Sequence, residues 1–265
     1  MRLLMLAPML ALLGATAPAK PQRIVSLNLC ADQYIMALAD RGQIAALSRN
    51  ARDPGMSADA VKARAYPVTR GAAEDVLALR PDLIVAAPGR VQATMAQLRG
   101  RRIAMLDVAS ADRYADIVSQ IRDVARAIGH PARGEALIAR MNAGMATIPN
   151  DAGRGKIAAY YQRRGYLTGT GTLVDELLRR VGLRNLATRL GKPPLARVGL
   201  EELVRARPDY LVVESETDRI ADQGTEMLHH PLLAKIPRVR LPQAWTVCGG
   251  PAYVRAARSI AAQIS

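Results

Sequence analysis

The segments AEDVLALRPDLIVA (residues 73–86) and LEELVRARPDYLVV (residues 200–213) repeat one pattern. Each begins as a helical pattern with acidic residues, reaches Arg-Pro-Asp, and continues into a short apolar run. Proline cannot continue a helix and favours an extended residue before it, so we expect each helix to end there with an extended arginine. The apolar runs at 83–87 and 210–213 are typical of strands buried on both faces of a parallel sheet.

The repetition extends upstream of both segments. RIVSL (23–27) and KIAAY (156–160) each read as a short buried strand that opens a strand–loop–helix unit. The spacing of the two copies is far longer than the roughly 20–50 residues of a solenoid repeat. The sequence therefore predicts an α/β protein with two similar lobes, at residues 20–130 and 151–265. A helical pattern at 131–150 is the predicted connection between them.

Composition and net charge limit the classes of partner that the protein can bind. Half of the 265 residues are hydrophobic, which is typical of a globular protein, and the formal net charge is +14. This charge favours anionic partners, but it is spread along the chain rather than gathered in a basic run or arm. No basic helix with interleaved aromatic residues occurs, so we expect no nucleic-acid partner.

The first 19 residues are typical of a secretory signal peptide. Arg2 precedes the apolar run Leu3–Leu13, which is too short to span a bilayer. Cleavage after Ala17 and cleavage after Ala19 both fit the small-residue pattern, and we favour the second because Pro18 would follow the first. We expect an exported, periplasmic protein without stable membrane insertion.

The chain lacks the sequence signatures of common catalytic and metal sites. It contains no Gly-x-Ser-x-Gly elbow, no Walker loop and no His-Glu-x-x-His. His130, His229 and His230 are interpreted as solvated residues at helix ends rather than metal ligands. We therefore expect no enzymatic activity, no metal site and no resident cofactor.

Polar residues follow the predicted strands. In open parallel sheets, ligands bind outside the carboxyl ends of the strands. The candidate ligand-binding residues are Asn28, Cys30, Arg49, Arg52, Arg70, Arg90, Tyr161, Arg163, Trp245 and Cys248. Several guanidinium groups around one cleft would suit a ligand with carboxylates or other delocalised negative charge.

Three parts of the chain together resemble a known family. They are RIVSLNLCADQYIMALA (23–39), the two helix–Arg-Pro-Asp–strand units, and WTVCGGPAYVRAARSIAAQ (245–263). The chain resembles the helical-backbone class of periplasmic substrate-binding proteins, which serve ABC importers of iron–siderophore complexes, haem and cobalamin. The resemblance implies two Rossmann-like lobes with parallel sheets, joined by a single long helix. It also implies a monomer that captures a small-molecule metal chelate and delivers it to a permease dimer with its ATPase.

The resemblance implies a role for two acidic residues. Members of this family present one glutamate on each lobe to arginines of the permease. The matching positions here are Glu74 and Glu201, each at the start of the helix that precedes Arg-Pro-Asp. The alternative is that both are first-turn acids favoured by the helix dipole.

The sequence leaves open the identity of the ligand and the bonding state of the two cysteines. One Trp and no Phe offer few aromatic rings to a corrin, so we favour an anionic ferric siderophore over cobalamin or haem. Cys30 and Cys248 follow the first and last predicted strands; they could form a disulfide across the cleft or remain free thiols at the ligand.

A sensor or adaptor that binds a ligand and reports to another membrane partner is a second hypothesis for the function. An exported α/β enzyme is a third, but it lacks a recognisable nucleophile–base pair.

Overall fold

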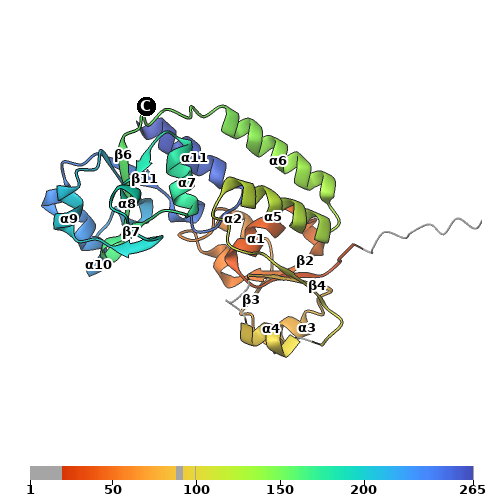
Figure 1. Ribbon diagram of the computed structural model, residues 1–265. Coiled ribbons are helices and arrows are strands. Elements are labelled where there is room, and N and C mark those ends of the chain that lie inside the picture. Colours follow the sequence, from red (N-terminus) through yellow and green to blue (C-terminus); the bar gives the residue numbers. More distant parts are fainter. Residues whose placement is uncertain (1–19, 88–91, 99, 265) are drawn as a thin grey trace, which may run out of the picture.

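The computed structural model describes residues 20–87, 92–98 and 100–264, which form two α/β lobes (Figure 1). The amino-terminal lobe contains a five-stranded sheet in the order β3-β2-β1-β4-β5, with every pairing parallel. Its strands are β1 (Ile24–Ser26), β2 (Ile44–Ser48), β3 (Val68–Thr69), β4 (Leu83–Ala86) and β5 (Ala104–Asp107). Its helices are α1 (Leu29–Leu38), α2 (Ala60–Ala63), α3 (Ala73–Ala78), α4 (Gln92–Leu98) and α5 (Tyr114–Ala127), with short 3-10 helices η1 (Arg41–Gln43) and η2 (Arg49–Arg52).

Alternation along the strands explains how this sheet is covered. Ile24 and Val85 pack in one hydrophobic cluster with α1 and α5, whereas Val25 and Ile84 pack in another with α3 and α4. Successive strand residues point to opposite faces, so a continuous apolar run buries both faces of the sheet. The amino-terminal sheet is therefore parallel and covered on both sides, as predicted.

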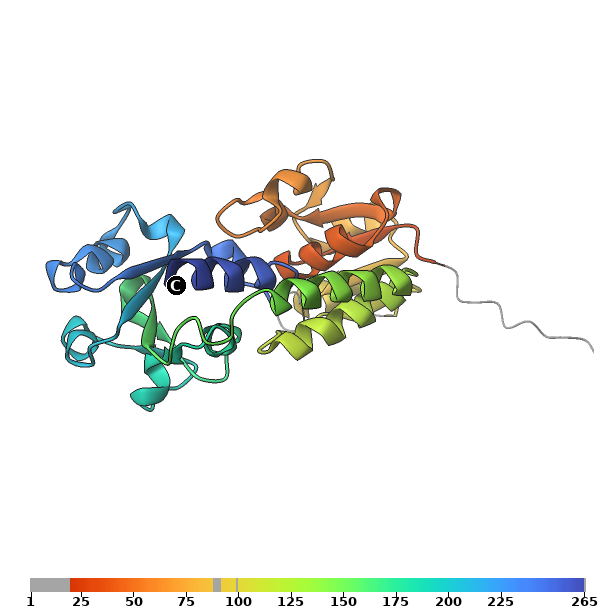
Figure 2. The ribbon, with the colours of Figure 1, turned by 90° about the horizontal axis from the view of Figure 1, so that it is seen from above.

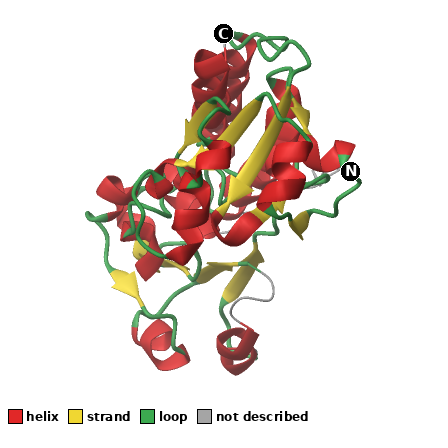
Figure 3. Ribbon diagram, turned by 90° about the vertical axis from the view of Figure 1, so that its left-hand side faces the viewer, coloured by secondary structure: helices red, strands yellow, loops and turns green. Residues whose placement is uncertain are grey.

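The carboxy-terminal lobe contains a mixed sheet in the order β11-β10-β6-β7-β9, with β8 also paired to β6. Its strands are β6 (Ile157–Gln162), β7 (Tyr166–Thr168), β8 (Arg184–Asn185), β9 (Leu195–Arg197), β10 (Tyr210–Glu214) and β11 (Arg238–Leu241). Its helices are α7 (Leu173–Arg180), α8 (Leu186–Arg189), α9 (Leu200–Arg205), α10 (Gln223–Glu226) and α11 (Tyr253–Ile264). Its 3-10 helices are η3 (Arg163–Gly165), η4 (Ser215–Thr217), η5 (Met227–His229), η6 (Pro231–Leu233) and η7 (Gln243–Trp245). Figure 3 shows the helices of this lobe around its strands.

The prediction of a parallel sheet was wrong for part of this lobe. β6, β8, β10 and β11 are parallel, but β7 runs antiparallel to β6 and to β9. Only η3 separates β6 from β7, and a connection this short can join only antiparallel neighbours. Arg164 and Gly165 adopt φ values of 61° and 76°, the left-handed backbone that makes this tight turn.

The two Arg-Pro-Asp motifs have the same local structure. Arg80 and Arg207 have φ values of 47° and 48°, so the prediction of an extended arginine was wrong. Each residue instead ends its helix in the left-handed conformation, and the proline that follows prevents further helix. The carboxylate of Asp82 then accepts hydrogen bonds from the backbone N–H groups of Gln22 (2.7 Å) and Arg23 (2.9 Å). The carboxylate of Asp209 accepts one from Ile157 (2.7 Å). Each motif thereby aligns the strand that follows it with the first strand of its own lobe.

The long helix α6 (Pro131–Ala146) lies between the last element of the amino-terminal lobe and the first strand of the carboxy-terminal lobe. α6 packs against α5 and α11, and Figure 2 shows α11 reaching from one lobe toward the other. One hydrophobic cluster includes Tyr34 of α1, Met141 of α6, Leu178 of α7 and Ile260 of α11. The two lobes therefore share a continuous core behind the cleft that separates their sheets.

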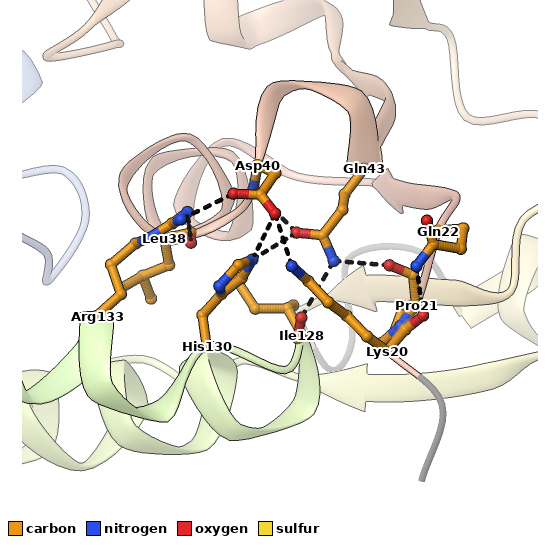
Figure 4. A network of polar contacts seen from close by, with 9 residues as sticks. All are labelled: Lys20, Pro21, Gln22, Leu38, Asp40, Gln43, Ile128, His130 and Arg133. Atoms are coloured by element: carbon orange, nitrogen blue, oxygen red, sulfur yellow. Dashed lines mark hydrogen bonds and ion pairs between the residues drawn. The ribbon is translucent and has the colours of Figure 1, made fainter. Parts of the chain in front are cut away.

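A polar network fixes the start of α6 to the amino-terminal lobe (Figure 4). The Asp40 carboxylate accepts from Lys20 (2.6 Å) and Arg133 (2.8 Å) and lies 3.1 Å from His130 Nε2. The side-chain amide of Gln43 donates to the carbonyl of Ile128 (3.1 Å). The His130 side chain is only 12% exposed, so the interpretation of this residue as solvated was wrong. Burial and the neighbouring Arg133 lower the pKa of His130.

We predict that Asp40→Asn lowers the melting temperature near neutral pH and that this difference shrinks in acid. Hydrogen bonds from Lys20 and Arg133 hold the pKa of the Asp40 carboxyl well below its ordinary value. A depressed carboxyl pKa stabilises the fold above the unfolded pKa of about 3.9, and this contribution is lost as the pH falls further. Thermal unfolding of both proteins between pH 7 and pH 2 measures it, with the exposed Asp151→Asn as control. A constant difference across that range would contradict the assignment.

Candidate ligand-binding cleft

Three connected cavities form a cleft, of which the central one lies between the lobes. The first, called here the N-cavity, has a volume of about 370 Å³ and is lined by residues that include Asn28, Arg49 and Arg70. The central cavity, of about 430 Å³, is lined from one lobe by residues such as Asp112 and from the other by residues such as Glu214. The C-cavity, of about 350 Å³, lies in the carboxy-terminal lobe beside η3. Adjacent cavities share lining residues, so the three form one cleft with the size of a small-molecule site.

The cleft lies where strands of both sheets end. Arg49 and Arg70 directly follow β2 and β3, while Gln162 and Glu214 are the last residues of β6 and β10. Parallel strands bring their carboxyl ends to one edge of a sheet, and ligands bind outside that edge. The cavities therefore lie at the strand ends, the place where the sequence analysis expected a ligand to bind.

A disulfide between Cys30 and Cys248 forms part of the cleft wall. The two Cα atoms are 5.3 Å apart although the residues are separated by 218 positions. Both residues line the N-cavity and the central cavity, so the bridge lies at their junction. The structure thus resolves the alternatives left open above in favour of a disulfide over free thiols.

Further contacts hold the segment that follows Cys248 against the amino-terminal lobe. The hydroxyl of Tyr34 donates to the carbonyl of Gly249 (2.6 Å), and Arg255 donates to the carboxylate of Asp59 (3.2 Å). A Cβ atom at Gly249 would lie 2.3 Å from the Cβ of Ala111, so only glycine permits this approach. The chain therefore returns from β11 to the amino-terminal lobe before α11 begins.

The N-cavity is positively charged. Arg49 and Arg70 are exposed, and within the described residues neither forms an ion pair. The described lining of this cavity contains no aspartate or glutamate. Guanidinium groups without a carboxylate partner in a concave site suit an anionic ligand.

A buried carboxylate positions one side of the N-cavity. Asp32 of α1 is fully buried and accepts hydrogen bonds from the backbone N–H (2.9 Å) and hydroxyl (2.6 Å) of Ser48. Burial raises the pKa of Asp32 to about 6, although the hydrogen bonds from Ser26 and Ser48 act in the opposite direction. This contact joins α1 to the end of β2 and so fixes the position from which Arg49 projects.

Several predicted residues lie elsewhere. Arg52 donates to the carbonyl of Tyr66 and is not among the lining residues, and Arg90 lies outside the described part of the chain. Trp245 packs against the hydrophobic core, although its neighbour Thr246 lines the central cavity. The structure therefore does not bring the predicted set of arginines together in one place.

Tyr161 faces away from the cleft. Its buried hydroxyl donates to the carbonyl of Val198 (2.7 Å), and its ring lies in the core of the carboxy-terminal lobe. Tyr160, its neighbour on β6, lines the central cavity, and its hydroxyl lies 3.2 Å from that of Thr246. Successive strand residues point to opposite faces of the sheet. The prediction of Tyr161 as a ligand-binding residue therefore selected the tyrosine that faces the core instead of the one that faces the cleft.

The carboxy-terminal part of the cleft is more acidic than the sequence prediction implied. Arg163 lines the C-cavity as expected, but its guanidinium lies 3.9 Å from the carboxylate of Asp222. Glu214, absent from the predicted set, is 3% exposed and lines both the central cavity and the C-cavity. Burial raises the pKa of Glu214, while the hydrogen bond from Gln162 (3.1 Å) acts to lower it. Its position at the carboxyl end of an apolar strand was the available sequence signal.

Glu74 and Glu201 occupy equivalent positions in the two lobes. Each is the second residue of its helix, α3 or α9, and each is exposed. Within the described residues neither carboxylate has a hydrogen-bond or ion-pair partner. Both are therefore available to a partner from solvent.

Comparison with known proteins identifies the family. Residues 24–242 match the family described as periplasmic binding protein. The chain belongs to this family. The match confirms the resemblance drawn from the sequence, and the family is one of binding proteins. In the described residues no helix is long and apolar enough to cross a membrane, and no group of three His, Cys, Asp or Glu side chains could hold a metal ion.

Individual relatives differ in their ligands. A cobalamin-binding protein of Halobacterium salinarum is 26% identical over 215 residues, which is 77% of this chain but only 57% of that protein. The apo periplasmic haem-binding protein RhuT of Roseiflexus sp. RS-1 has a TM-score of 0.72 at 24% identity and covers 92% of this chain and 99% of its own. An ABC-type Fe3+-hydroxamate transport protein of Saccharomonospora viridis has a TM-score of 0.68 at 19% identity, covering 92% and 93%. The two structural matches support the fold.

We predict that removing the disulfide with Cys30→Ser and Cys248→Ser together lowers the free energy of unfolding by about 2–4 kcal/mol. The bridge restricts the unfolded chain by closing a very long loop. Urea unfolding of the double variant and of the oxidised wild type measures the difference. Reduced wild-type protein should behave like the variant, and equal stability of all three would contradict the prediction.

Proposed function

We propose that this protein is the periplasmic substrate-binding component of an ABC importer and captures an anionic ferric siderophore in its cleft. The family match and the shared fold support a capture role. The observation that carries the choice of ligand is the pair of unpaired arginines, Arg49 and Arg70, in a cavity whose described lining has no acidic residue. An anionic chelate would supply the missing negative charge.

Cobalamin is the second candidate. The similarity to a cobalamin-binding protein of Halobacterium salinarum favours it. Cobalamin, however, contains no array of carboxylates to match two arginines, and the described lining of the N-cavity contains no aromatic side chain to pack against a corrin. Haem has two carboxylates and is the ligand of RhuT, so it belongs in the same set of test ligands.

We predict that Arg49→Gln together with Arg70→Gln weakens the binding of an anionic ferric siderophore by about tenfold or more, because charge-assisted hydrogen bonds contribute about 1.5–3 kcal/mol. Wild-type affinity should also fall as salt rises, since exposed charges are screened. Calorimetric titration of ferric enterobactin, ferric citrate, haem and cobalamin at two salt concentrations measures both effects.

The exposed Arg64, which lies outside the cleft lining, provides the matched control as Arg64→Gln. This variant should bind like the wild type. Tight, salt-insensitive binding of cobalamin without binding of any ferric chelate would contradict the proposed ligand and leave the capture role intact.

Delivery to the permease is proposed to depend on Glu74 and Glu201. Their exposure, their equivalent helix positions and their lack of partners in the described structure support this role. Exposed ion pairs are worth only about 0–1 kcal/mol each, so a single substitution is less informative than the pair.

We predict that Glu74→Lys with Glu201→Lys abolishes uptake of labelled siderophore by cells that contain the cognate permease and ATPase. Affinity of the purified variant for the siderophore should remain within about twofold of wild type, a change of well under 1 kcal/mol. The exposed Glu226→Lys serves as the control for a charge reversal elsewhere on the surface. Normal uptake by the double variant would contradict the docking role and would favour a sensor or adaptor with another partner.

A further inference from the structure

The N-cavity and the central cavity are lined by charges of opposite sign, whereas the C-cavity is lined by both signs. Arg49 and Arg70 are the charged residues in the described lining of the N-cavity. Asp112 and Glu214 are the charged residues in the described lining of the central cavity. The bridge between Cys30 and Cys248, which lines both, marks the boundary. A ligand that spans this boundary therefore meets cations at one end and carboxylates at the other.

Glu214 is the decisive group in the acidic half. Glu214 is only 3% exposed, yet within the described residues its carboxylate forms no ion pair. The amide of Gln162 donates to its Oε1 (3.1 Å). A buried carboxylate without a cationic partner lowers stability, so such groups are found where a ligand or reaction needs them.

The surroundings of Glu214 leave its charge incompletely balanced. Arg163 is the cation that acts on it, but this guanidinium lies closer to Asp222, while Glu216 adds a second negative charge nearby. The remaining groups that affect it, Tyr160 and Gln162, are neutral hydrogen-bonding side chains. The site thus offers acceptor capacity and negative charge to a ligand in the central cavity.

We infer that the cleft binds a bipolar metal chelate in one orientation, with carboxylates against Arg49 and Arg70 and a cationic or strongly hydrogen-bond-donating end against Glu214. This inference rests on the proposed capture of a ferric siderophore and narrows the chemical class of that ligand. A chelate with negative charge on all sides would place part of that charge against Glu214 and Asp112. The cleft should therefore bind a bipolar chelate more tightly than a uniformly anionic one, because carboxylates of the ligand and of the central cavity repel each other.

Linear ferric trihydroxamates provide a direct test. Ferrioxamine G carries a carboxylate at one end and an ammonium group at the other, and its N-acetyl derivative keeps the carboxylate but loses the positive charge. Wild-type protein should bind ferrioxamine G about tenfold more tightly than the N-acetyl derivative, and Glu214→Gln should bring the ratio close to one. Glu226→Gln, an exposed change in the same lobe, should keep the wild-type ratio.

Stability gives a readout that does not depend on the probe. Removing an uncompensated buried charge should raise the melting temperature of the ligand-free protein by about 2 °C or more in Glu214→Gln. A lower melting temperature would show that Glu214 supports the fold and would overturn the inference.

The outcomes also separate the inference from the function on which it rests. Equal wild-type affinity for ferrioxamine G and its N-acetyl derivative would overturn the bipolar cleft while leaving siderophore capture in place. Binding of neither ferric probe, together with tight binding of cobalamin or haem, would overturn the proposed function and the inference with it.

Discussion

The covalent bond between Cys30 and Cys248 fixes the part of the molecule on which the cleft depends. It joins the first turn of α1 to the segment before α11, and Tyr34 and Arg255 add hydrogen bonds on either side of it. The bond lines two cavities at once, so the walls of both are set by one constraint. An oxidising compartment such as the periplasm would allow this bond to persist, which agrees with the proposed location.

The core behind the cleft acts together with this bond. One hydrophobic cluster runs from α1 through α6 and α7 to α11, so separating the lobes would expose apolar surface. The Asp40 network further fixes the start of α6 to the amino-terminal lobe (Figure 4). A stiff scaffold of this kind favours a largely preformed site, in which charged side chains are positioned before the ligand arrives.

Much of the fold was predictable because it follows local rules. The repeated Arg-Pro-Asp motifs identified two helix–strand units, and the apolar runs identified β4 and β10. The antiparallel β7 was missed because its turn depends on two left-handed residues, Arg164 and Gly165, and arginine gives no sequence signal for that conformation. The extended arginine predicted before each proline was wrong for a similar reason, since the end of a helix imposed a left-handed backbone there.

The site was predicted less well because it depends on side-chain direction. The expectation that ligands bind at the carboxyl ends of strands selected Asn28, Arg49 and Arg70, which line the N-cavity. It could not tell that Tyr160 faces the cavity while Tyr161 faces the core, nor that Arg52 is bonded to a carbonyl. Glu214 could be recognised from the sequence as a strand-end polar residue, but its burial without a cationic partner follows from tertiary packing, which the sequence does not display.

The central claim is that the cleft captures an anionic iron chelate. Native mass spectrometry of the protein recovered from the periplasm of its own cells, compared with the same sample after denaturation, tests it most directly. We expect a released molecule with the isotopic pattern of iron and with at least one carboxylate or comparable acidic group. Release of a cobalt corrinoid instead would contradict the claim.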